Sequence, residues 1–317
     1  MKVQDNILKD AGRLVFWHPI RWLANLLPCR TVGFIGKMTG HLDYYLFKGR
    51  AEKIGMNLRH AFGNTMTNRR SRDIVKKILA NHYTLILEFF KYPQIVERNI
   101  ASIVSVEGLE NLDNALAQGR GAIIGHCHFG AKLLLIIVLG LNKYSINQIA
   151  YHMPKEELTY IREKVSLKQR LKIERSFKVN YIYLSKGLRR AFSCLDDNEV
   201  LMVAIDGKGI LTETFSGSVC VNFLGQNAYF ASGVATLSRR KRTPILPAAV
   251  FRKDDGTYRM VISPPIEIDY ENEGRAFASD VIEKLIAVFE GDIRRHPDQW
   301  EYWEEFGPGE MDDGQGR

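Results

Sequence analysis

The sequence contains little cysteine. Its four cysteines, Cys29, Cys127, Cys194 and Cys220, are widely spaced and form no C-x-x-C pair. Four thiols are too few to stabilise a chain of 317 residues by disulfide bonds, so we do not expect a disulfide-rich secreted fold. We expect the protein in a reducing compartment instead. We expect most of these cysteines to be inert core residues.

Long uninterrupted apolar runs are also missing. No such run follows the start of the chain, so we do not expect a cleavable signal peptide. Residues 12–28 are apolar and aromatic, but Arg13, Arg21 and Pro19 interrupt them and spoil a spanning helix of about 20 residues. Tryptophans and flanking arginines suit a segment that lies on a membrane surface, and packing on the folded domain is the alternative.

The composition excludes a disordered protein. With 45% hydrophobic residues, 25% charged residues and no internal repeat, we expect one compact α/β domain with a helical N-terminal extension. The net charge of +8 indicates an anionic partner. The basic stretch at 157–190 is either a solvated helix face or a landing surface for phosphates of a donor or a membrane. Because it lacks regularly interleaved aromatic residues, nucleic-acid binding is not expected.

Hydrophobic periodicity divides the chain into two parts. Apolar residues recur every three or four positions between 69 and 93, which is typical of an amphipathic helix. Short apolar runs then alternate with helical periodicity, which predicts a mainly parallel sheet flanked by helices. We predict a helical, membrane-associating extension at 1–100, an α/β domain at 101–306 and a disordered tail at 307–317. The expected strands lie at 122–125, 148–151, 181–184, 200–205, 245–251 and 259–264, with a closing helix at 277–293.

A polar turn follows the first of these strands. The motif Gly-His-Cys-His-Phe-Gly at 125–130 places His126 and His128 between a buried strand and an apolar helix at 131–141. That carboxyl edge of the sheet is where open α/β folds bind ligands. Backbone N–H groups near a helix start hold a developing oxyanion, and we expect those near Phe129 and Gly130 to do so.

A series of blocks in a fixed order carries a family resemblance. The blocks are Asn57-Leu58, the histidine turn, Ala204-Ile205-Asp206-Gly207, Asn222-Phe223-Leu224-Gly225, the 252–258 turn with Ser263-Pro264-Pro265, and Pro297-Asp298-Gln299-Trp300-Glu301-Tyr302-Trp303. Together they resemble the lysophospholipid acyltransferase family, in particular its lipid A secondary (lauroyl/myristoyl) acyltransferase branch. The similarity covers about residues 17–306.

This resemblance implies a membrane-associated O-acyltransferase. Such an enzyme moves a fatty acyl chain from an acyl thioester, acyl-ACP or acyl-CoA, to a hydroxyl of a lipid or glycolipid. The branch implies lipid A, and so lipopolysaccharide, or other envelope lipid biosynthesis at the cytoplasmic face of the inner membrane, by a peripheral or monotopic protein. It implies no cofactor and no metal.

The resemblance also assigns chemistry to a histidine. In the family this histidine deprotonates the acceptor hydroxyl and a carboxylate stands five residues later. Here Leu133 stands five residues after His128, so the acid is missing there. Asp206 ends the apolar strand at 200–205, at the same predicted sheet edge, and is the partner that we favour. The other two readings are that His128 works alone, or that the chain has lost its chemistry and kept lipid binding.

The remaining expected site residues bind substrate. His126 and Gly130 belong to the histidine turn, Lys132 follows it, and Arg170 lies near the place of a functional arginine in the resembled family. Lys132 and Arg170 are expected to bind phosphate of the donor or acceptor. The block at 222–225 is expected to shape the acceptor side, and the tryptophans of the last block are expected to serve packing.

Two other functions stay open. A catalytically disabled lipid-binding relative fits the missing acid. A zinc-dependent hydrolase fits less well: His126 and His128 have metal-ligand spacing and Asp206 offers an oxygen, but no further ligand follows at the usual offsets.

Overall fold

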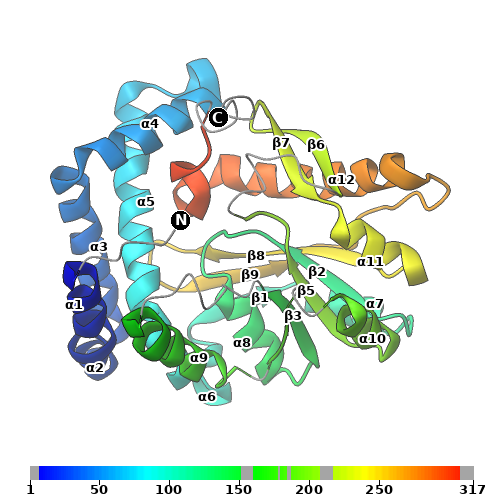
Figure 1. Cartoon of the computed structure of the whole chain (residues 1–317), viewed down its shortest axis with the longest axis horizontal. Coiled ribbons are helices and arrows are strands. Elements are labelled where there is room, and N and C mark those ends of the chain that lie inside the picture. The colour runs from blue at the N-terminus through cyan, green and yellow to red at the C-terminus, as the bar shows by residue number, and fades with distance from the viewer. Residues whose placement is uncertain (1–6, 151–159, 178, 184–186, 208–216, 308–317) are drawn as a thin grey trace.

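A seven-stranded sheet forms the centre of the molecule (Figure 1). The computed structural model describes residues 7–150, 160–177, 179–183, 187–207 and 217–307, so the tail predicted at 307–317 lies outside it from residue 308 on. The strand order is β1-β9-β8-β2-β5-β3-β4, and every neighbouring pair is parallel except β8 and β9. The predicted mainly parallel sheet flanked by helices is confirmed. The strands are β1 (Val104–Glu107), β2 (Ala122–His126), β3 (Ile146–Ala150), β4 (Val179–Tyr183), β5 (Val200–Ala204), β8 (Ile245–Arg252) and β9 (Tyr258–Ile262).

Helices cover both faces of this sheet, because its strands are apolar on both sides. In β2, Ile123 belongs to one hydrophobic core and its neighbour Ile124 to the other. The first core is completed by α10 (Arg189–Asp196), α11 (Gly233–Lys241) and α12 (Gly274–Arg295), and the second by α7 (Leu109–Leu116) and α8 (Leu133–Leu141). A further helix, α9 (Lys168–Glu174), continues a π-helical turn at Arg162–Leu167.

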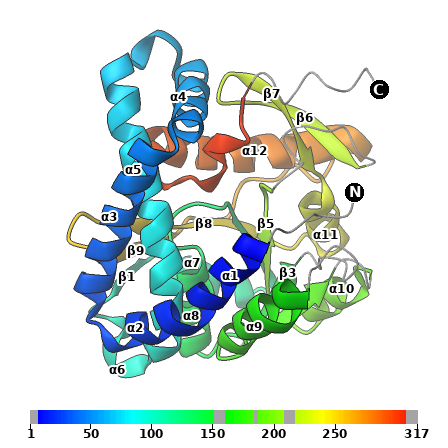
Figure 2. The same cartoon turned by 60° about the vertical axis from the view of Figure 1, so that its left-hand side comes forward.

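The N-terminal helices form a wall beside the sheet (Figure 2). Side chains of this wall belong to both hydrophobic cores, so the helical part is built into the domain. Its longest helix, α5, begins after Thr67, whose side chain accepts a hydrogen bond from Arg70 N and caps the helix. The elements are α1 (Ile7–Val15), a π-helical turn (Phe16–Ile20), α2 (Arg21–Leu26), α3 (Cys29–Leu46), α4 (Lys48–Phe62), a 3₁₀ turn (Gly63–Thr65), α5 (Asn68–Glu88), a 3₁₀ turn (Phe89–Gln94) and α6 (Glu97–Ile100).

The segment at 12–28 packs on the folded domain in part, and its expected role on a membrane surface stays a prediction. Trp17 is buried and its ring packs edge-on against Phe90 with ring centroids 5.5 Å apart. Trp22, Leu23 and Leu26 on α2 are instead exposed. Across the described residues, no helix has the length and apolar character needed to cross a membrane.

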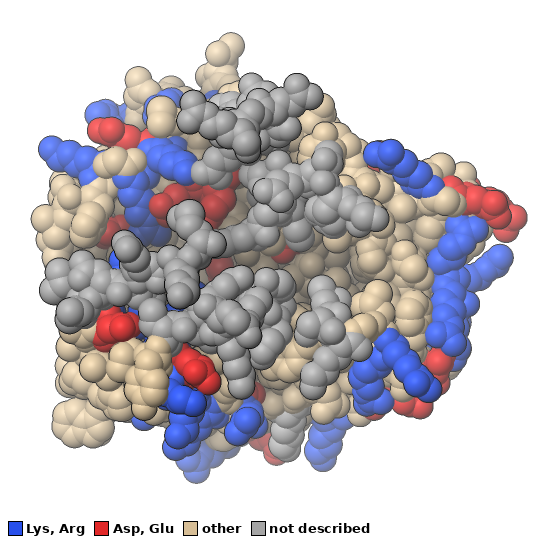
Figure 3. Space-filling model, in the orientation of Figure 1, with Lys and Arg blue, Asp and Glu red and all other residues tan. Residues whose placement is uncertain are grey.

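The two faces of α3 differ sharply. Gly36 and Gly40 face α5 so closely that an added Cβ would lie 2.5 Å from Thr84 Cα and 2.4 Å from Ala80 N. The opposite face carries exposed apolar side chains at helical spacing, which we call the outer strip: Phe34, Ile35, Met38, Leu42, Tyr45 and Leu46. The lower left edge in Figure 3, where the N-terminal helices lie, is accordingly mostly uncharged, whereas lysine and arginine gather at the right-hand edge.

A two-stranded hairpin was not anticipated from the sequence. β6 (Ser218–Phe223) and β7 (Gln226–Ala231) pair antiparallel and pack along α12. The block at 222–225 is the tight turn of this hairpin, with Leu224 and Gly225 at positive φ. Phe223 is buried against Trp300, with ring centroids 5.5 Å apart. The block packs in the core and donates one hydrogen bond, from Leu224 N to Glu290 Oε2 at 3.0 Å, and the expected acceptor-shaping role stays a prediction.

Candidate active site

The parallel pairing of β2 and β5 brings His128 and Asp206 together. In the sheet, His126 at the end of β2 lies opposite Ala204 at the end of β5. His128 and Asp206 each lie two residues further along, so both leave the sheet at the same carboxyl edge. His128 Nδ1 and Asp206 Oδ1 are 2.8 Å apart.

Asp206 is buried yet fully provided with donors. It is 2% exposed and accepts hydrogen bonds from the backbone N–H of His128, from the His128 ring and, at 2.9 Å, from the indole N–H of Trp300. Burial acts to raise the pKa of Asp206, but the hydrogen bond and the charge of His128, together with the Trp300 bond, outweigh it and hold that pKa below its usual value. The carboxylate is therefore ionised at neutral pH.

This arrangement fixes the tautomer of His128. A carboxylate beside Nδ1 stabilises the proton on that nitrogen and leaves Nε2 as the basic atom. Within the residues that the structure describes, Nε2 has no hydrogen-bond partner. The ring is a quarter exposed and packs against Tyr302, with ring centroids 4.8 Å apart. The pair has the geometry of a general base with a positioning acid.

The C-terminal block holds the histidine turn in place. Gly130 N donates to Gln299 O at 2.7 Å, and Glu301 N donates to His128 O at 2.9 Å. The side chain of Gln299 in turn exchanges two hydrogen bonds with the backbone of Arg252. These bonds tie the turn to β8 and bring Trp300 to Asp206.

Trp300 was expected to serve packing, and that expectation was too narrow. It is 1% exposed and does pack in the core, but its N–H also binds Asp206. Only the chain fold brings residue 300 to residue 206, so neighbouring sequence gave no signal for this contact.

The expected oxyanion donors are occupied, which corrects the sequence-based prediction. The N–H of Phe129 donates to Cys127 O at 2.8 Å and that of Gly130 donates to Gln299 O. Gly130 has a φ of 53°, and a Cβ there would lie 1.9 Å from Val250 O, so this glycine is required by the close approach of two backbones. The parallel bridge of Gly130 with Val250 also engages the N–H side of Ala131, whereas no acceptor is found in the described chain for the N–H group of Lys132.

His126 lies behind the turn, 6% exposed, and its Nε2 has no hydrogen-bond partner. Burial and the nearby charge of His128 lower the pKa of His126 to about 4, so the ring is neutral at physiological pH. A buried nitrogen without a partner is unusual. Its substrate-binding role stays a prediction.

The two cations predicted to bind phosphate both have carboxylate partners. Lys132 Nζ lies 2.6 Å and 2.7 Å from the two carboxylate oxygens of Glu301. Arg170 is 62% exposed and pairs with Glu174 one turn along α9. Each would have to exchange its carboxylate for a phosphate on binding substrate.

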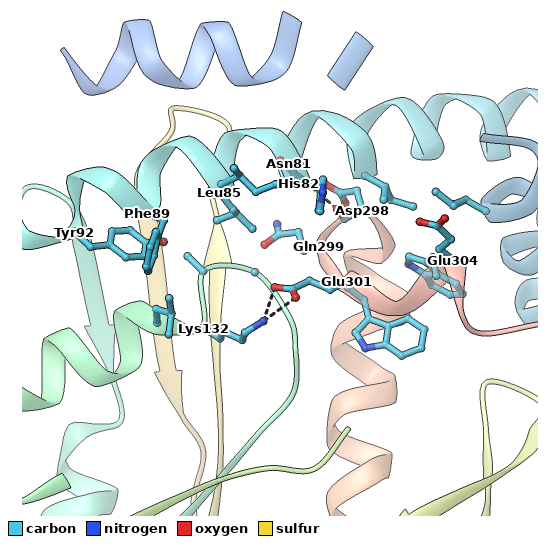
Figure 4. Close-up of a pocket in the computed structure, with 18 of the residues that line it drawn as sticks. Asn81, His82, Leu85, Phe89, Tyr92, Lys132, Asp298, Gln299, Glu301 and Glu304 are labelled. Carbon is cyan, nitrogen blue, oxygen red and sulfur yellow. Dashed lines mark hydrogen bonds and ion pairs between the residues drawn. The ribbon is translucent and has the colours of Figure 1, made fainter. Parts of the chain in front are cut away.

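A cavity of about 350 Å³ begins beside the histidine turn. Gly130, Lys132 and Trp300 line it, although His128 does not, and Leu133 lines it where the family's acid was expected. Figure 4 shows the Lys132–Glu301 ion pair crossing it, with Leu85, Phe89 and Tyr92 at one end and Asp298 and Glu304 at the other. Its apolar walls come mainly from the N-terminal helices and suit a fatty acyl chain: Phe16, Trp17, Leu85, Ile86 and Phe89.

The zinc hydrolase alternative finds no support in this geometry. Among the residues that the structure describes, no three His, Cys, Asp or Glu side chains converge to hold a metal ion. His128 directs Nδ1 at Asp206, and His126 is buried beside it without a third ligand.

Comparisons with known proteins show which family the chain belongs to. Residues 12–304 match the model of a family described as bacterial lipid A biosynthesis acyltransferase. The chain is 25% identical over 289 residues to the lipid A biosynthesis palmitoleoyltransferase of Escherichia coli K12, covering 89% of this chain and 86% of that protein. It is similarly 25% identical to a lipid A biosynthesis acyltransferase of Shigella flexneri, and 24% identical over 277 residues to the lauroyltransferase of E. coli K12, covering 85% of each chain. The family match spans nearly the whole chain, so this protein belongs to the bacterial lipid A biosynthesis acyltransferase family.

Proposed function

We propose that this protein transfers a fatty acyl chain from an acyl thioester, acyl-ACP or acyl-CoA, to a hydroxyl group of lipid A or a related envelope lipid. The observation that carries the proposal is the ionised, buried Asp206 beside His128 Nδ1, which leaves Nε2 as a base at the sheet edge. Asp206 thus takes the part of the acid that Leu133 replaces in the histidine motif.

In the proposed reaction, His128 Nε2 takes the proton of the acceptor hydroxyl. The hydroxyl oxygen forms a bond to the thioester carbonyl carbon, the carbon–sulfur bond breaks, and the thiol leaves with the proton from His128. Asp206 stabilises the imidazolium between these steps. No cofactor or metal is needed. The N–H group of Lys132, rather than those of Phe129 and Gly130, is proposed to hold the oxyanion.

Substrate binding is assigned to the surroundings of this pair. The acyl chain occupies the cavity behind Gly130, between Phe89 and Leu133. Lys132 and Arg170 bind phosphate by exchanging their carboxylate partners, and the buried Nε2 of His126 accepts a hydrogen bond from the acceptor.

We further propose that the protein works on a membrane surface, at the cytoplasmic face of the inner membrane. The outer strip of α3 and the exposed Trp22, Leu23 and Leu26 of α2 present large apolar side chains to solvent. Exposed apolar surface of this extent marks an interaction site.

The test is a mass-spectrometric acyl-transfer assay with a lipid A precursor and either donor. Wild type is expected to add one acyl chain, His128→Ala to lose about 10²–10⁴-fold in rate, and Asp206→Ala about 10²-fold or more. His60→Ala, which changes an exposed histidine on α4, is the control and should keep the wild-type rate. A wild type that binds lipid but forms no product with either donor would replace the proposal with the disabled, lipid-binding reading.

A further inference from the structure

A second cavity, of about 540 Å³, lies among α3, α4 and α5. It shares no lining residue with the cavity beside the histidine turn and contains none of the predicted site residues. Its floor is small and neutral, with Ala51, Gly55 and Ser71. It therefore belongs to a separate site.

The walls of this cavity are basic. Lys48, Arg59 and Arg72 line it, against the single carboxylate of Glu52. In the described part of the chain, no carboxylate lies within ion-pair distance of any of these three cations. The Arg59 guanidinium is held over the floor, 3.4 Å from Ser71 Oγ. Unpaired cations gathered around one hollow repel each other, so an anion bound there would be stabilised.

Two arginines near this cavity, Arg50 on α4 and Arg252 at the end of β8, are paired instead. Arg50 bonds Glu304 at 2.8 Å, and Arg252 binds both oxygens of Glu88 at 2.8 Å. The start of the 21-residue helix α5 adds to the positive potential, because Asn68 at its first position also lines the cavity.

The cavity borders the apolar face of α3. Tyr45 lines the cavity and belongs to the outer strip, where it is 60% exposed, and Phe47 beside Lys48 is exposed to the same extent. Lys76 lies 5.1 Å and 5.6 Å from the ring centroids of Tyr44 and Tyr45, which adds a fourth positive charge at this rim. A ligand with an anionic group and attached hydrocarbon chains is complementary to a basic cavity that adjoins an apolar strip.

We propose that the cavity among α3, α4 and α5 binds the phosphate of an anionic membrane phospholipid, whose acyl chains lie along the outer strip. The bound lipid is a membrane anchor and not a reactant. The proposal rests on the proposed function only in taking the protein to work on a membrane. The bound lipid orients the domain, because it places α3 and the start of α5 at the lipid surface.

The test measures binding of the full chain to vesicles of phosphatidylcholine with and without phosphatidylglycerol, by flotation and without any acyl donor. Arg59→Gln with Arg72→Gln is expected to weaken binding to the anionic vesicles about 25-fold, since each cation near a lipid surface is worth about fivefold. The matched control is Arg189→Gln with Arg275→Gln, two exposed arginines at the starts of α10 and α12, on the other side of the molecule in Figure 1. The control pair should change vesicle binding less than about twofold. Its charges would lie further from the lipid surface than the screening length of about 8 Å.

Three outcomes would overturn the proposal: equal losses for the two pairs, no preference of wild type for anionic vesicles, or displacement of the vesicles by millimolar glycerol phosphate, which would make the cavity a free-anion site. Thermal unfolding checks that the variants fold. If Arg59→Gln does not fold, the pair Lys48→Gln with Arg72→Gln is used in place of Arg59→Gln with Arg72→Gln. His128→Ala should bind vesicles like wild type, so a failed acyl-transfer assay and a failed anchor are told apart.

Discussion

The reaction centre and the outer strip of α3 depart from the usual distribution of residues in opposite directions. Asp206 is a carboxylate that is almost completely buried, and Phe34, Met38 and Leu42 are large apolar residues that are more than half exposed. The buried carboxylate has a donor for each oxygen, whereas the exposed side chains have no partner in the described structure. A buried charge persists only when it is paired, while an exposed apolar strip persists at little cost to folding. The buried carboxylate thus has its partners within the chain, and we propose that the strip has its partner outside the chain.

The largest expected effect separates the two faces of α3. Gly40→Leu should lower the free energy of unfolding by about 3 kcal/mol or more, because its Cβ alone would lie 2.4 Å from Ala80 N. Leu42→Ser on the outer strip should change it by less than about 0.5 kcal/mol, yet weaken vesicle binding. Chemical denaturation and flotation measure the two quantities. Similar destabilisation by both substitutions would show that the outer strip is packed in solution, and the two faces of α3 would then not differ as described.

The next effect concerns pH and the buried His126. Its pKa of about 4 in the folded protein, against about 6.5 when unfolded, means that the folded state resists protonation. The corresponding stability, up to about 3 kcal/mol, is complete above pH 6.5 and is lost as the pH falls from 6.5 to about 4. The free energies of unfolding of wild type and His126→Asn, measured by denaturation at several pH values, should therefore converge as the pH falls from 7 to 4. His60→Gln, at an exposed position, should stay parallel to wild type, and a parallel His126→Asn curve would contradict the prediction.

The part of the site that the sequence predicts is the part made by adjacent strands. The apolar runs fix β2 and β5, and parallel strands that end at one edge bring His128 and Asp206 together. The contribution of Trp300 was not predictable in this way, because it depends on how residues 297–303 return across the sheet. The occupied N–H groups of Phe129 and Gly130 were missed for the same reason, since Gln299 reaches Gly130 from far along the chain.

The outer strip illustrates the same limit at the level of the fold. Two tryptophans within residues 12–28 suggest a membrane-surface segment there, but Trp17 packs inside. The longer apolar face belongs to α3, where charged residues such as Arg30, Lys37 and Asp43 lie between the apolar ones and hide the stripe. Only the packing of Gly36 and Gly40 on α5 shows which face of α3 turns outward.

A smaller effect tests whether Trp300 positions the acid. Trp300→Phe keeps the ring and removes the N–H that binds Asp206, so acyl transfer should fall about 10- to 100-fold with little change in KM. The carboxylate becomes more basic without this donor, and the acidic limb of the pH–rate profile should move to higher pH. Trp303→Phe is the matched control, because its indole N–H donates instead to Pro297 O. If the acidic limb of the pH–rate profile moves equally in both variants, Trp300 serves only packing.

The smallest effect concerns the ion pair between Lys132 and Glu301 at the cavity. Both side chains are partly exposed, so breaking the pair should cost at most about 1 kcal/mol of stability, and less at high salt. The two residues differ in their expected effect on substrate. If Lys132 binds phosphate, Lys132→Gln should raise KM for the phosphorylated substrate several-fold at unchanged kcat, whereas Glu301→Gln frees the lysine and should leave KM equal or lower. If the pair only ties the histidine turn to the C-terminal block, both substitutions should lower kcat alike, since either one breaks the same bond across the cavity.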